Sequence, residues 1–279
     1  MFCLYPVRYS NARFGVRFSK TPDMECSIWS TLTDHHANIA MGMTAEKLAS
    51  LYQITRQESD EFSFQSQQRW AKAQQKGKFK DEIIPIPFKN RKTGLEELFE
   101  VDEHPKPKTT LEGLNKLPPV FKKDGVITAG SASGVCDGSA AIILASEDAV
   151  NKNDLKPLAR IVGYSVVGCA PDIMGIGPVA AIRNLCDRTG ILLNQIDVIE
   201  VNEAFAAQFL AVSKELGLDP AKTNVNGGAI ALGHPIGASG GRILANLTYE
   251  LNNTNKKYAI GAACIGGGQG IAILLEKVN

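Results

Sequence analysis

The sequence has neither an excess of charge of one sign nor a long apolar run. Among its 279 residues, 30 are basic and 29 acidic, which gives a formal net charge of +1. This balance excludes the strongly basic surface expected of a protein that binds nucleic acid or an anionic membrane. No apolar run approaches the roughly 18 residues that a membrane-spanning helix requires. With 44% hydrophobic residues, the composition is typical of a globular protein with one large domain or two of ordinary size.

The chain also lacks the cysteine and histidine spacings of disulfide-rich or metal-binding proteins. No C-x-x-C pair and no regular spacing occur among the cysteines, which argues against a disulfide framework or a zinc site and favours a reducing compartment. The histidines are not spaced as metal ligands, so we expect no metal. The residues concerned are Cys3, Cys26, Cys136, Cys169, Cys186, Cys264, His35, His36, His104 and His234.

Acidic residues are missing from the first twenty-two positions, which carry several arginines. This composition fits a transit peptide. The alternative is that the segment YPVRYSNARFG (5–15) is ordinary protein interior.

Local signals divide the chain into two parts. Residues 1–125 predict an irregular α+β region, with a capping box at Thr55 and Glu58 that opens a helix ending at Gly77. In the same region, Thr44 is expected to cap a short helix over 45–52. The segment 82–88 is expected to be an edge strand because it contains two prolines.

The second part alternates strands with helices, which predicts a layered α/β domain. Pro178 opens and Gly190 closes one of these helices, and Ser146 is expected to cap another. The remaining helices are expected over 204–216, apolar almost all round and therefore buried, and 238–251. Strands are expected over 140–145, 158–164, 197–201, the segment NVNG (224–227), 258–264 and 270–276.

Three motifs of this α/β half contain candidate functional residues. The first is NEAF, in which Asn202 stands where a strand ends and a helix begins. Ligands of open α/β sheets bind at the carboxyl ends of strands, and an amide offers both a donor and an acceptor there. Asparagine is equally a preferred helix N-cap, so a purely structural role for Asn202 stays open.

The second motif is the glycine-rich segment NVNGGAIALGHPIGASGGRI (224–243), which contains His234. Such a segment leads backbone N–H groups into a helix N-terminus and suits an oxyanion or a phosphate. It matches neither the Walker A loop nor G-x-G-x-x-G. The proline after His234 restricts its backbone, so the direction of the imidazole should be fixed.

The third motif is CIGGGQG (264–270), which follows a strand. Little side-chain bulk screens Cys264, and nearby backbone N–H groups could stabilise a thiolate or an oxyanion. The alternative is a buried structural cysteine.

Taken together, NEAFA, GGAIALGHPIGASG and CIGGGQG closely resemble the thiolase family. The segments PVRYSNARFG, MTAEKLA, VDEHPKPKTTLEGL, FKKDGVITAGSASGVCDGSAA and MGIGPVAAI resemble it too and occur in the family's order. The nearest subgroup is that of the mitochondrial 3-ketoacyl-CoA thiolases of fatty-acid β-oxidation. Acetoacetyl-CoA thiolases commonly have His-Met where this chain has Ala40-Met41. The resemblance also shows that residues 5–15 match thiolase interior, which favours that interpretation over a transit peptide.

The resemblance implies a fold, an activity and a catalytic set. The fold is the layered α/β fold of thiolases, and the activity is thiolytic cleavage of 3-ketoacyl-CoA to acetyl-CoA and a shortened acyl-CoA. His234 would activate the nucleophile, and Cys264 would act as general acid and base after a modest downward shift of its pKa. Asn202 would fix a water in one oxyanion hole, and a backbone N–H near Gly266 would serve the second.

The resemblance likewise assigns the ligand contacts. Coenzyme A would be a co-substrate held by Lys106, Thr109 and Ser133, with no permanently bound cofactor. Lys106 stands where close family members often have arginine, so the charge for a phosphate is kept without the bidentate fork. Phe205 and Met41 would line the acyl pocket, although plain core packing explains them as well.

The sequence departs from the family at one point. The family's nucleophilic cysteine lies in a VCGSG-like segment, which does not occur in these 279 residues. Cys3 and Cys26 lack the glycine context of that segment. We therefore expect a truncated N-terminal half, whose sheet would expose an unpaired apolar edge at 140–145.

The predicted organisation is a loop domain over 1–125, a remnant of the N-terminal thiolase domain over 126–155, and a complete C-terminal thiolase domain over 156–279. Expected partners are acyl-CoA and CoA, with no nucleic acid and no membrane span. The family's homodimer or tetramer would be impaired, and the expected location is the mitochondrial matrix. The alternative function is a catalytically dead paralogue that binds acyl-CoA or a full-length thiolase.

Overall fold

The computed structural model describes residues 7–9, 15–18 and 24–278. Four strands form its principal sheet, in the order β7-β10-β9-β8. Their bounds are β7 Ala159–Gly168, β8 Val198–Val201, β9 Tyr258–Ile265 and β10 Gln269–Lys277. β8 is parallel to β9, whereas β10 is antiparallel to both β9 and β7. The carboxyl ends of β8 and β9 therefore lie at the same edge of the sheet, here called the carboxyl edge.

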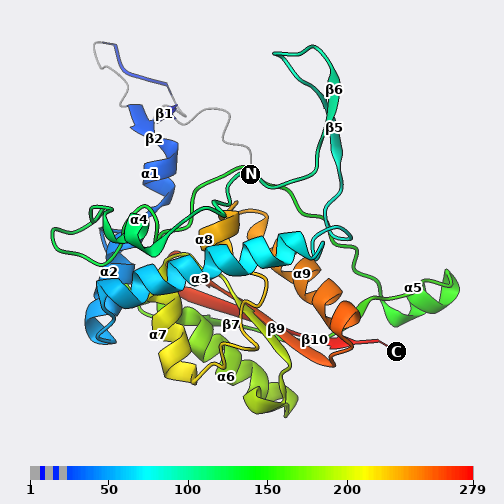
Figure 1. Ribbon diagram of the computed structural model, residues 1–279. Helices are drawn as coiled ribbons and strands as arrows, with labels where there is room; N and C mark the ends of the chain where they lie inside the picture. The colour runs from blue at the N-terminus through cyan, green and yellow to red at the C-terminus, as the bar shows by residue number, and fades with distance from the viewer. Residues whose placement is uncertain (1–6, 10–14, 19–23, 279) are drawn as a thin grey trace.

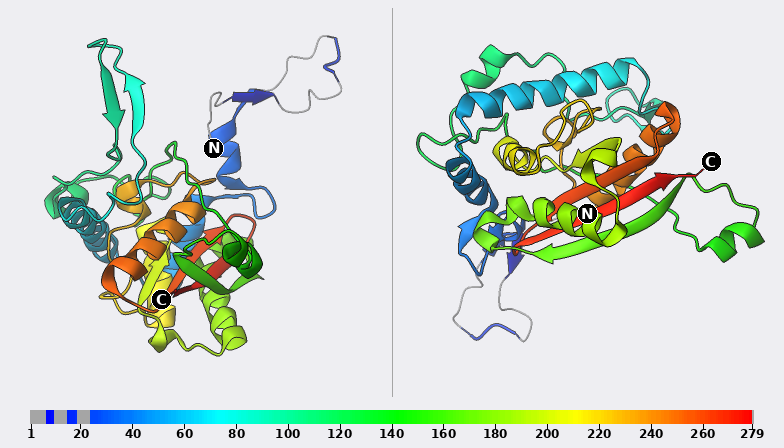
Figure 2. Two further views of the ribbon diagram at one scale, coloured as in Figure 1. Left: turned by 90° about the vertical axis from the view of Figure 1, so that its right-hand side faces the viewer. Right: turned by 90° about the horizontal axis from the view of Figure 1, so that it is seen from below.

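Helices cover both faces of this sheet (Figures 1 and 2). α9 (Ser239–Thr254) packs on β8, β9 and β10 from one side, whereas α6 (Gly177–Thr189) packs on β7, β9 and β10 from the other. α7 (Ala206–Leu216) contacts α6, and the next helices outward are α2 (Met41–Leu51) and α3 (Arg56–Gln75). The layered thiolase-type α/β architecture predicted from the sequence is confirmed.

The main core lies between α6, α7, α3 and the sheet. The rings of Phe62 on α3 and Phe209 on α7 stack with centroids 4.3 Å apart. Ile182 and Leu185 of α6 are fully buried against β9 and β10. Because each fully buried side chain of this size stabilises the fold by roughly 1.5–3 kcal/mol, this cluster holds the layers together.

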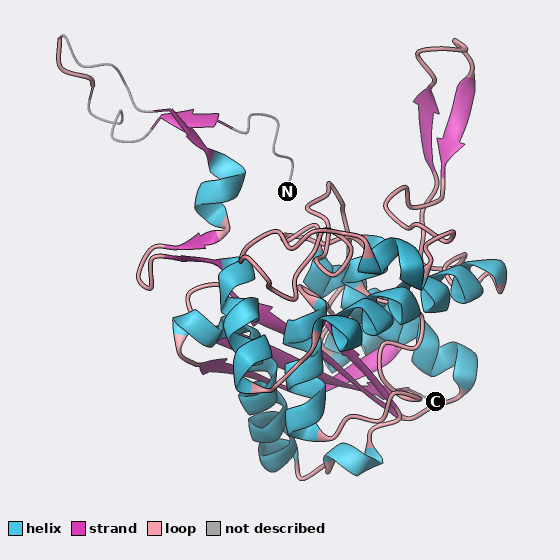
Figure 3. Cartoon of the chain, turned by 60° about the vertical axis from the view of Figure 1, so that its left-hand side comes forward, coloured by secondary structure: helices cyan, strands magenta, loops and turns pink. Residues whose placement is uncertain are grey.

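Short elements complete the chain. They are β1 Val7–Tyr9, β2 Met24–Cys26, α1 Ser27–Thr31, β3 Thr33–Asp34, β4 Ile39–Ala40, β5 Ile86–Lys89, β6 Glu96–Phe99, α4 Leu111–Asn115, α5 Glu147–Lys152, the 3-10 helices η1 Pro171–Ile176 and η2 Leu193–Gln195, and α8 Ala229–Leu232. Figure 3 shows the β5–β6 hairpin and the strands β1 and β2 projecting from the body. In the part of the chain that the structure describes, no helix combines the length and apolarity needed to cross a membrane.

The helix boundaries given by local signals are confirmed in three places. Thr55 and Glu58 form the predicted capping box at the start of α3. The Ser146 hydroxyl accepts from the backbone N–H of Ala149 and caps α5. Gly190 adopts the left-handed conformation, with φ 70°, directly after α6.

The capping box of α3 yields a stability prediction. Replacing Thr55 by alanine removes the acceptor of the Glu58 backbone N–H, a 3.1 Å hydrogen bond, and is expected to lower the free energy of unfolding by about 1 kcal/mol. Urea denaturation followed by circular dichroism measures the change. Gln57→Ala, in the same exposed turn but outside the cap, should change stability by less than about 0.5 kcal/mol. Equal effects of the two substitutions would contradict the prediction.

Other sequence predictions about the first region are wrong in detail. Thr44 does not cap a helix, because α2 begins three residues earlier and the Thr44 hydroxyl donates inside it to the carbonyl of Met41, at 2.6 Å. The predicted edge strand over 82–88 begins only at Ile86 and pairs with β6 in a two-stranded hairpin.

Two predicted strands of the α/β half do not form. Residues 140–145 are extended but unpaired, and the Ile143 side chain is 92% exposed, because no strand within the described residues lies beside them. The segment NVNG turns instead, since Asn224 has φ 47°. Its backbone N–H donates to the carbonyl of Ile199 in β8, and its side chain extends this pairing: Oδ1 accepts from the N–H of Val201 and Nδ2 donates to its carbonyl, each bond at 2.9 Å.

Candidate active site

Asn202 lies at the carboxyl edge of the sheet, directly after β8. Its backbone N–H donates to the carbonyl of Ala262 at 2.8 Å and so extends the pairing of β8 with β9. The residue is 1% exposed, and its Oδ1 atom has no hydrogen-bond partner among the described residues. The helix N-cap interpretation of Asn202 is wrong, because α7 begins at Ala206 with Phe205 at the cap. The amide therefore serves something other than the helix.

His234 reaches the same edge from the glycine-rich segment. α8 ends at Gly233, whose φ of 86° turns the chain sharply. The backbone N–H of His234 then donates to the carbonyl of Gly134 at 2.8 Å. Its ring meets the Asn202 amide, with 3.4 Å between Nδ2 of Asn202 and Nε2 of His234. The structure thus brings together two side chains that are 32 residues apart in the sequence.

The neighbours of the His234 ring determine which nitrogen holds the proton. Nδ1 lies 2.6 Å from the Ser239 hydroxyl, which is 3.1 Å from the carbonyl of Pro235. When the Ser239 hydroxyl donates its one proton to the carbonyl of Pro235, its oxygen accepts from Nδ1–H of His234. In this tautomer the lone pair of His234 is on Nε2, where the Asn202 amide donates to it. An imidazole in this tautomer presents Nε2 as a base.

The imidazole is also held neutral. Burial, followed by the positive charge of Arg242, lowers the pKa of His234 to about 4. Arg242 is fixed near the ring by an ion pair with the buried carboxylate of Glu200 on β8. A neutral ring can accept a proton from a nucleophile at pH 7, as a general base must.

Cys264 lies on β9, the strand next to β8. The parallel register pairs Val201 with Ala262, which places Cys264 and Asn202 at the same carboxyl edge. Burial, with a further contribution from Cys169, raises the pKa of the Cys264 thiol to about 12. The sequence-based expectation of a modest downward shift is therefore wrong. A thiol with this pKa is protonated at neutral pH and can act as a proton donor.

Gly266 begins the glycine turn between β9 and β10. The Met41 side chain lies against it, because a Cβ built on Gly266 would be 2.9 Å from the Met41 Cε atom. Two residues further on, Gly268 has φ 83° and accepts a hydrogen bond from the N–H of Cys169 at 2.7 Å. The turn is thus fixed to the segment after β7, and Met41 lies against its first glycine.

The predicted CoA contacts come from two segments. The backbone N–H of Lys106 donates to Oε1 of Gln67 at 2.8 Å, its side chain is exposed, and its carbonyl accepts from the N–H of Thr109 at 2.9 Å. The Ser133 hydroxyl donates to the carbonyl of Ala204, at 3.0 Å, within the NEAF motif. Ser133 thus contacts the NEAF motif two residues after Asn202. Lys106 is hydrogen-bonded to α3 through Gln67.

Phe205 lies in an aromatic pair with Phe121. Their ring centroids are 6.0 Å apart in an edge-to-face arrangement, and the Phe121 ring packs on Gly42, the neighbour of Met41. The two predicted pocket residues, Phe205 and Met41, are therefore joined through one aromatic contact. The structure is consistent with either an acyl pocket or plain packing.

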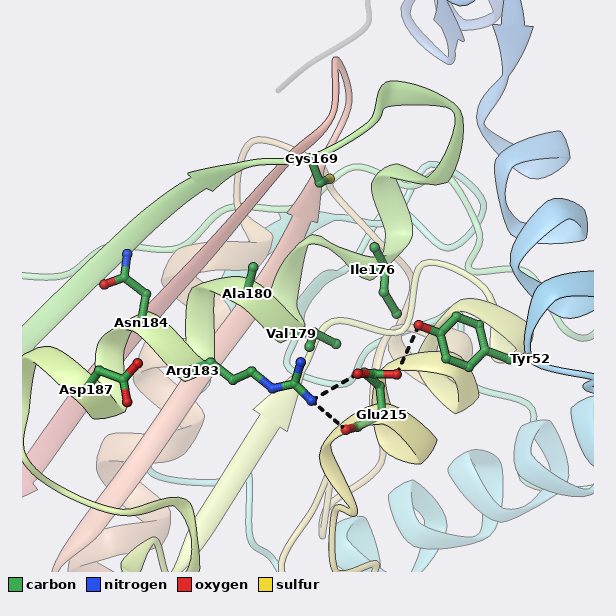
Figure 4. Close-up of a pocket in the computed structure, with 9 residues that line it drawn as sticks. All are labelled: Tyr52, Cys169, Ile176, Val179, Ala180, Arg183, Asn184, Asp187 and Glu215. Atoms are coloured by element: carbon green, nitrogen blue, oxygen red, sulfur yellow. Dashed lines mark hydrogen bonds and ion pairs between the residues drawn. The ribbon is translucent and has the colours of Figure 1, made fainter.

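A separate cleft of about 470 Å³ lies on the outer side of α6 (Figure 4). Within it, Arg183 pairs with Glu215 at 3.0 Å, and the Tyr52 hydroxyl donates to the same carboxylate at 3.2 Å. Neither Asn202, His234 nor Cys264 lines this cleft. The cleft is therefore a surface feature apart from the candidate site.

Glu203 is a residue that the sequence did not single out, although it belongs to NEAF. Its fully buried carboxylate accepts from the Ser66 hydroxyl at 2.7 Å, from the Asn224 amide at 2.8 Å and from the Ile230 backbone N–H at 3.1 Å. Burial raises the pKa of Glu203. The carboxylate thereby joins α3, the end of β8 and the helix that precedes His234. Ser239 was likewise not singled out from the sequence, although it lies within the segment GGAIALGHPIGASG.

Comparison with known proteins decides the family. The family models described as "Thiolase, N-terminal domain" and "Thiolase, C-terminal domain" match residues 4–148 and 155–277. The chain belongs to the thiolase family. It is 56% identical over 272 residues to the mitochondrial 3-ketoacyl-CoA thiolase of Bos taurus, which covers 98% of this chain and 68% of that thiolase.

Solved thiolase structures share the fold. The crystal structure of human mitochondrial 3-ketoacyl-CoA thiolase matches with a TM-score of 0.91 and 53% identity, over 98% of this chain and 69% of the human one. The human enzyme in complex with CoA matches with a TM-score of 0.89 and 52% identity, over 98% and 68% of the two chains. The arrangement of layers described above is therefore that of a thiolase.

Proposed function

We propose that the protein is an acyltransferase that cleaves 3-ketoacyl-CoA with CoA, giving acetyl-CoA and a shortened acyl-CoA. The observation that supports this most strongly is the neutral imidazole of His234, whose Nε2 meets the Asn202 amide at the sheet edge that Cys264 shares. Acyl transfer through a thiol nucleophile requires a base, an oxyanion site and a proton donor at one place. The similarity to mitochondrial 3-ketoacyl-CoA thiolases supports the choice of substrate.

In the first half-reaction, Nε2 of His234 takes the proton of the family's nucleophilic cysteine, which these 279 residues do not contain, and the sulfur attacks the 3-keto carbon. The C2–C3 bond then breaks, and the enolate of acetyl-CoA takes a proton from the Cys264 thiol. The raised pKa of that thiol keeps the proton in place until a strong base such as an enolate forms. A water held by Asn202, together with His234, would stabilise the thioester oxygen, and the N–H near Gly266 would serve the other oxyanion.

In the second half-reaction, the Cys264 thiolate takes the proton of the incoming CoA thiol. The CoA sulfur attacks the acyl-enzyme thioester, the bond to the nucleophilic cysteine breaks, and its sulfur takes back the proton held on Nε2 of His234, which releases the shortened acyl-CoA and restores the neutral imidazole. We place CoA on Lys106, Thr109 and Ser133, where the exposed ammonium of Lys106 offers a single positive charge for a phosphate. Phe205 and Met41 would line the acyl chain. CoA is a co-substrate in this scheme.

A second candidate function is binding of acyl-CoA, or of a full-length thiolase, without turnover. It is favoured by one observation, the absence of a VCGSG-like segment from these 279 residues. The groups at Asn202, His234 and Cys264 would then hold a thioester without forming an acyl-enzyme.

Product analysis separates the two candidates. The purified chain is incubated with 3-ketoacyl-CoA and CoA, and acetyl-CoA and the shortened acyl-CoA are quantified by mass spectrometry. Equal amounts of the two products support thiolysis, whereas no product above a Cys264→Ala control contradicts it. A rise in Tm with CoA in the absence of product would support binding without turnover. Neither product nor a rise in Tm would contradict both functions.

We further propose a mitochondrial matrix location and a homodimeric or tetrameric assembly. The first is supported by the mitochondrial relatives. Size-exclusion chromatography with light scattering tests the second, and a monomer at all concentrations would contradict it.

A further inference from the structure

His104 is half-buried where a long projecting segment returns to the body of the protein. The preceding residues 84–103 include the exposed β5–β6 hairpin (Figure 3). Two residues after His104 stands Lys106, one of the proposed CoA contacts. The imidazole of His104 therefore lies between the projecting segment 84–103 and the proposed CoA contact at Lys106, and its contacts fix the chain at this point.

The ring of His104 contacts three segments of the candidate site. Its Nδ1 lies 2.7 Å from the carbonyl of Ala231 in α8. Because a carbonyl only accepts, Nδ1 of His104 is the donor. The opposite nitrogen, Nε2, packs directly on Gly134, where no Cβ could be accommodated, and Cγ would be 3.3 Å from a Cβ built on Gly233. The ring thus fills the space between α8, Gly134 and the turn before His234.

The glycines that the His104 ring contacts are themselves joined to His234. Gly233, against which the ring packs, precedes His234, and Gly134 accepts the backbone N–H of His234 at 2.8 Å. A shift of the His104 ring would therefore move both the donor and the acceptor of this bond. Gly134 also follows Ser133, so the same ring borders a second proposed CoA contact.

A parallel connection runs through Gln67 of α3. Its Oε1 accepts from the N–H of Lys106 at 2.8 Å, and its Nε2 donates to the carbonyl of Ile230 at 3.3 Å. The segment 104–106 is thus attached to α8 at two successive carbonyls, those of Ile230 and Ala231. Two attachments fix both the position and the direction of this segment relative to His234.

We propose that His104 is a positioning residue that couples the CoA-binding segment at Lys106 to the imidazole of His234. It acts through the Nδ1–H bond to Ala231 and through packing on Gly134 and Gly233, without touching substrate. The part concerning CoA rests on the proposed function. The coupling to His234 is a property of the fold and holds whether or not the chain turns over substrate.

The test compares His104→Ala and His104→Asn with the unmodified protein. Asparagine places an N–H donor where Nδ1 of histidine lies, so His104→Asn should keep the bond to Ala231, whereas His104→Ala loses it. His35→Ala, at an exposed histidine, is the matched control. CoA affinity is measured by titration calorimetry. The ¹⁵N chemical shifts of the histidine rings report the tautomer of His234 independently of any activity.

The alanine variant is expected to bind CoA about 10-fold more weakly, the loss of roughly one buried hydrogen bond, and to shift or broaden the His234 ring signals. The asparagine variant should stay within about 3-fold of the unmodified protein. Unchanged His234 signals and unchanged affinity in His104→Ala would overturn the proposal. If the unmodified protein binds no CoA, the proposed function fails, and the His234 signals still decide the coupling.

If His104→Ala does not fold, His104→Asn is compared with His104→Gln instead. His104→Gln fills similar space but carries its amide one bond further from the backbone, so it cannot place a donor at the Nδ1 position. His234 ring signals that match the unmodified protein in His104→Asn, but not in His104→Gln, support the proposal. Indistinguishable signals in the two variants would overturn it.

Discussion

Replacing Gly268 by alanine is expected to destabilise the protein by about 3 kcal/mol or more. Two costs combine at this position. Gly268 has φ 83°, and a side chain in the left-handed region costs roughly 1–2 kcal/mol. A Cβ there would also clash with the carbonyl oxygen of Cys169 and lie 2.8 Å from the nitrogen of Pro171. These are backbone atoms, which cannot rotate away as a flexible side chain can, so overpacking adds roughly 1–3 kcal/mol.

The neighbouring glycine provides a matched control. Gly267 has almost the same φ, 82°, but the nearest atom to a Cβ there is Nε2 of Gln269 at 3.8 Å. Gly267→Ala should therefore cost only the backbone term, about 1–2 kcal/mol. Urea unfolding of both variants separates the two contributions. If Gly267→Ala and Gly268→Ala lose equal stability, the close approach of the Cys169 carbonyl contributes nothing, and the prediction is wrong.

The position of Gly268 gives this loss a consequence for the site. The Gly268 carbonyl accepts the N–H of Cys169, which joins the glycine turn to the end of β7. Displacing the turn would move the end of β9, where Cys264 lies. We therefore expect Gly268→Ala to increase the rate at which iodoacetamide alkylates Cys264 relative to Gly267→Ala, because its thiol would lose part of its burial.

Elements whose ends are set by neighbouring residues were predictable from the sequence. The capping box of α3 depends on Thr55 and Glu58, three residues apart, and the end of α6 depends on the left-handed Gly190. Each of these signals acts within one helical turn. No distant part of the chain has to be known for the boundary to be placed.

The predictions that were wrong concern segments whose structure depends on distant parts of the chain. Residues 140–145 have the side chains of a strand, but a strand requires a neighbouring backbone, and none of the described residues supplies one. At Asn224, the backbone N–H pairs with Ile199 of β8 and the side-chain amide pairs with Val201, while a φ of 47° turns the chain, so the segment expected to be a strand is a turn. Neither outcome follows from local propensity, because the hydrogen-bond partner decides both.

The candidate site shows the same division. Motif recognition singled out Asn202, His234 and Cys264; the strand order places Asn202 and Cys264 at one edge of the sheet, and the contact with the Asn202 amide brings His234 to it. The direction of the Cys264 pKa shift could not be predicted, since burial of the thiol depends on packing against distant segments. The contact of His104 with Ala231 of α8 likewise arises only when segments 127 residues apart in the sequence meet.

The second large effect concerns stability in acid. The pKa of His234 is about 4 in the folded protein, against about 6.5 for an unperturbed histidine. Between these values the unfolded chain binds a proton at His234 and the folded protein does not. The free energy of unfolding therefore falls as the pH drops through this window, by up to about 3 kcal/mol, and the contribution is fully present above pH 6.5.

Comparison with His234→Asn isolates this contribution. Other groups also titrate in acid, among them Glu58 and Glu276, whose pKa values are lowered by backbone and arginine partners respectively. These groups are present in both proteins, so their titration cancels in the comparison. The difference in unfolding free energy between the unmodified protein and His234→Asn should therefore shrink as the pH falls from 6.5 to 4, because only the imidazole of His234 binds a proton on unfolding in one protein and not in the other. A difference that does not change with pH would show that the pKa of His234 is the same in the folded and unfolded states. The imidazole would then titrate as in the unfolded chain, so the fold would not hold it neutral, and the burial that supports His234 as the base of the proposed acyl transfer would be wrong.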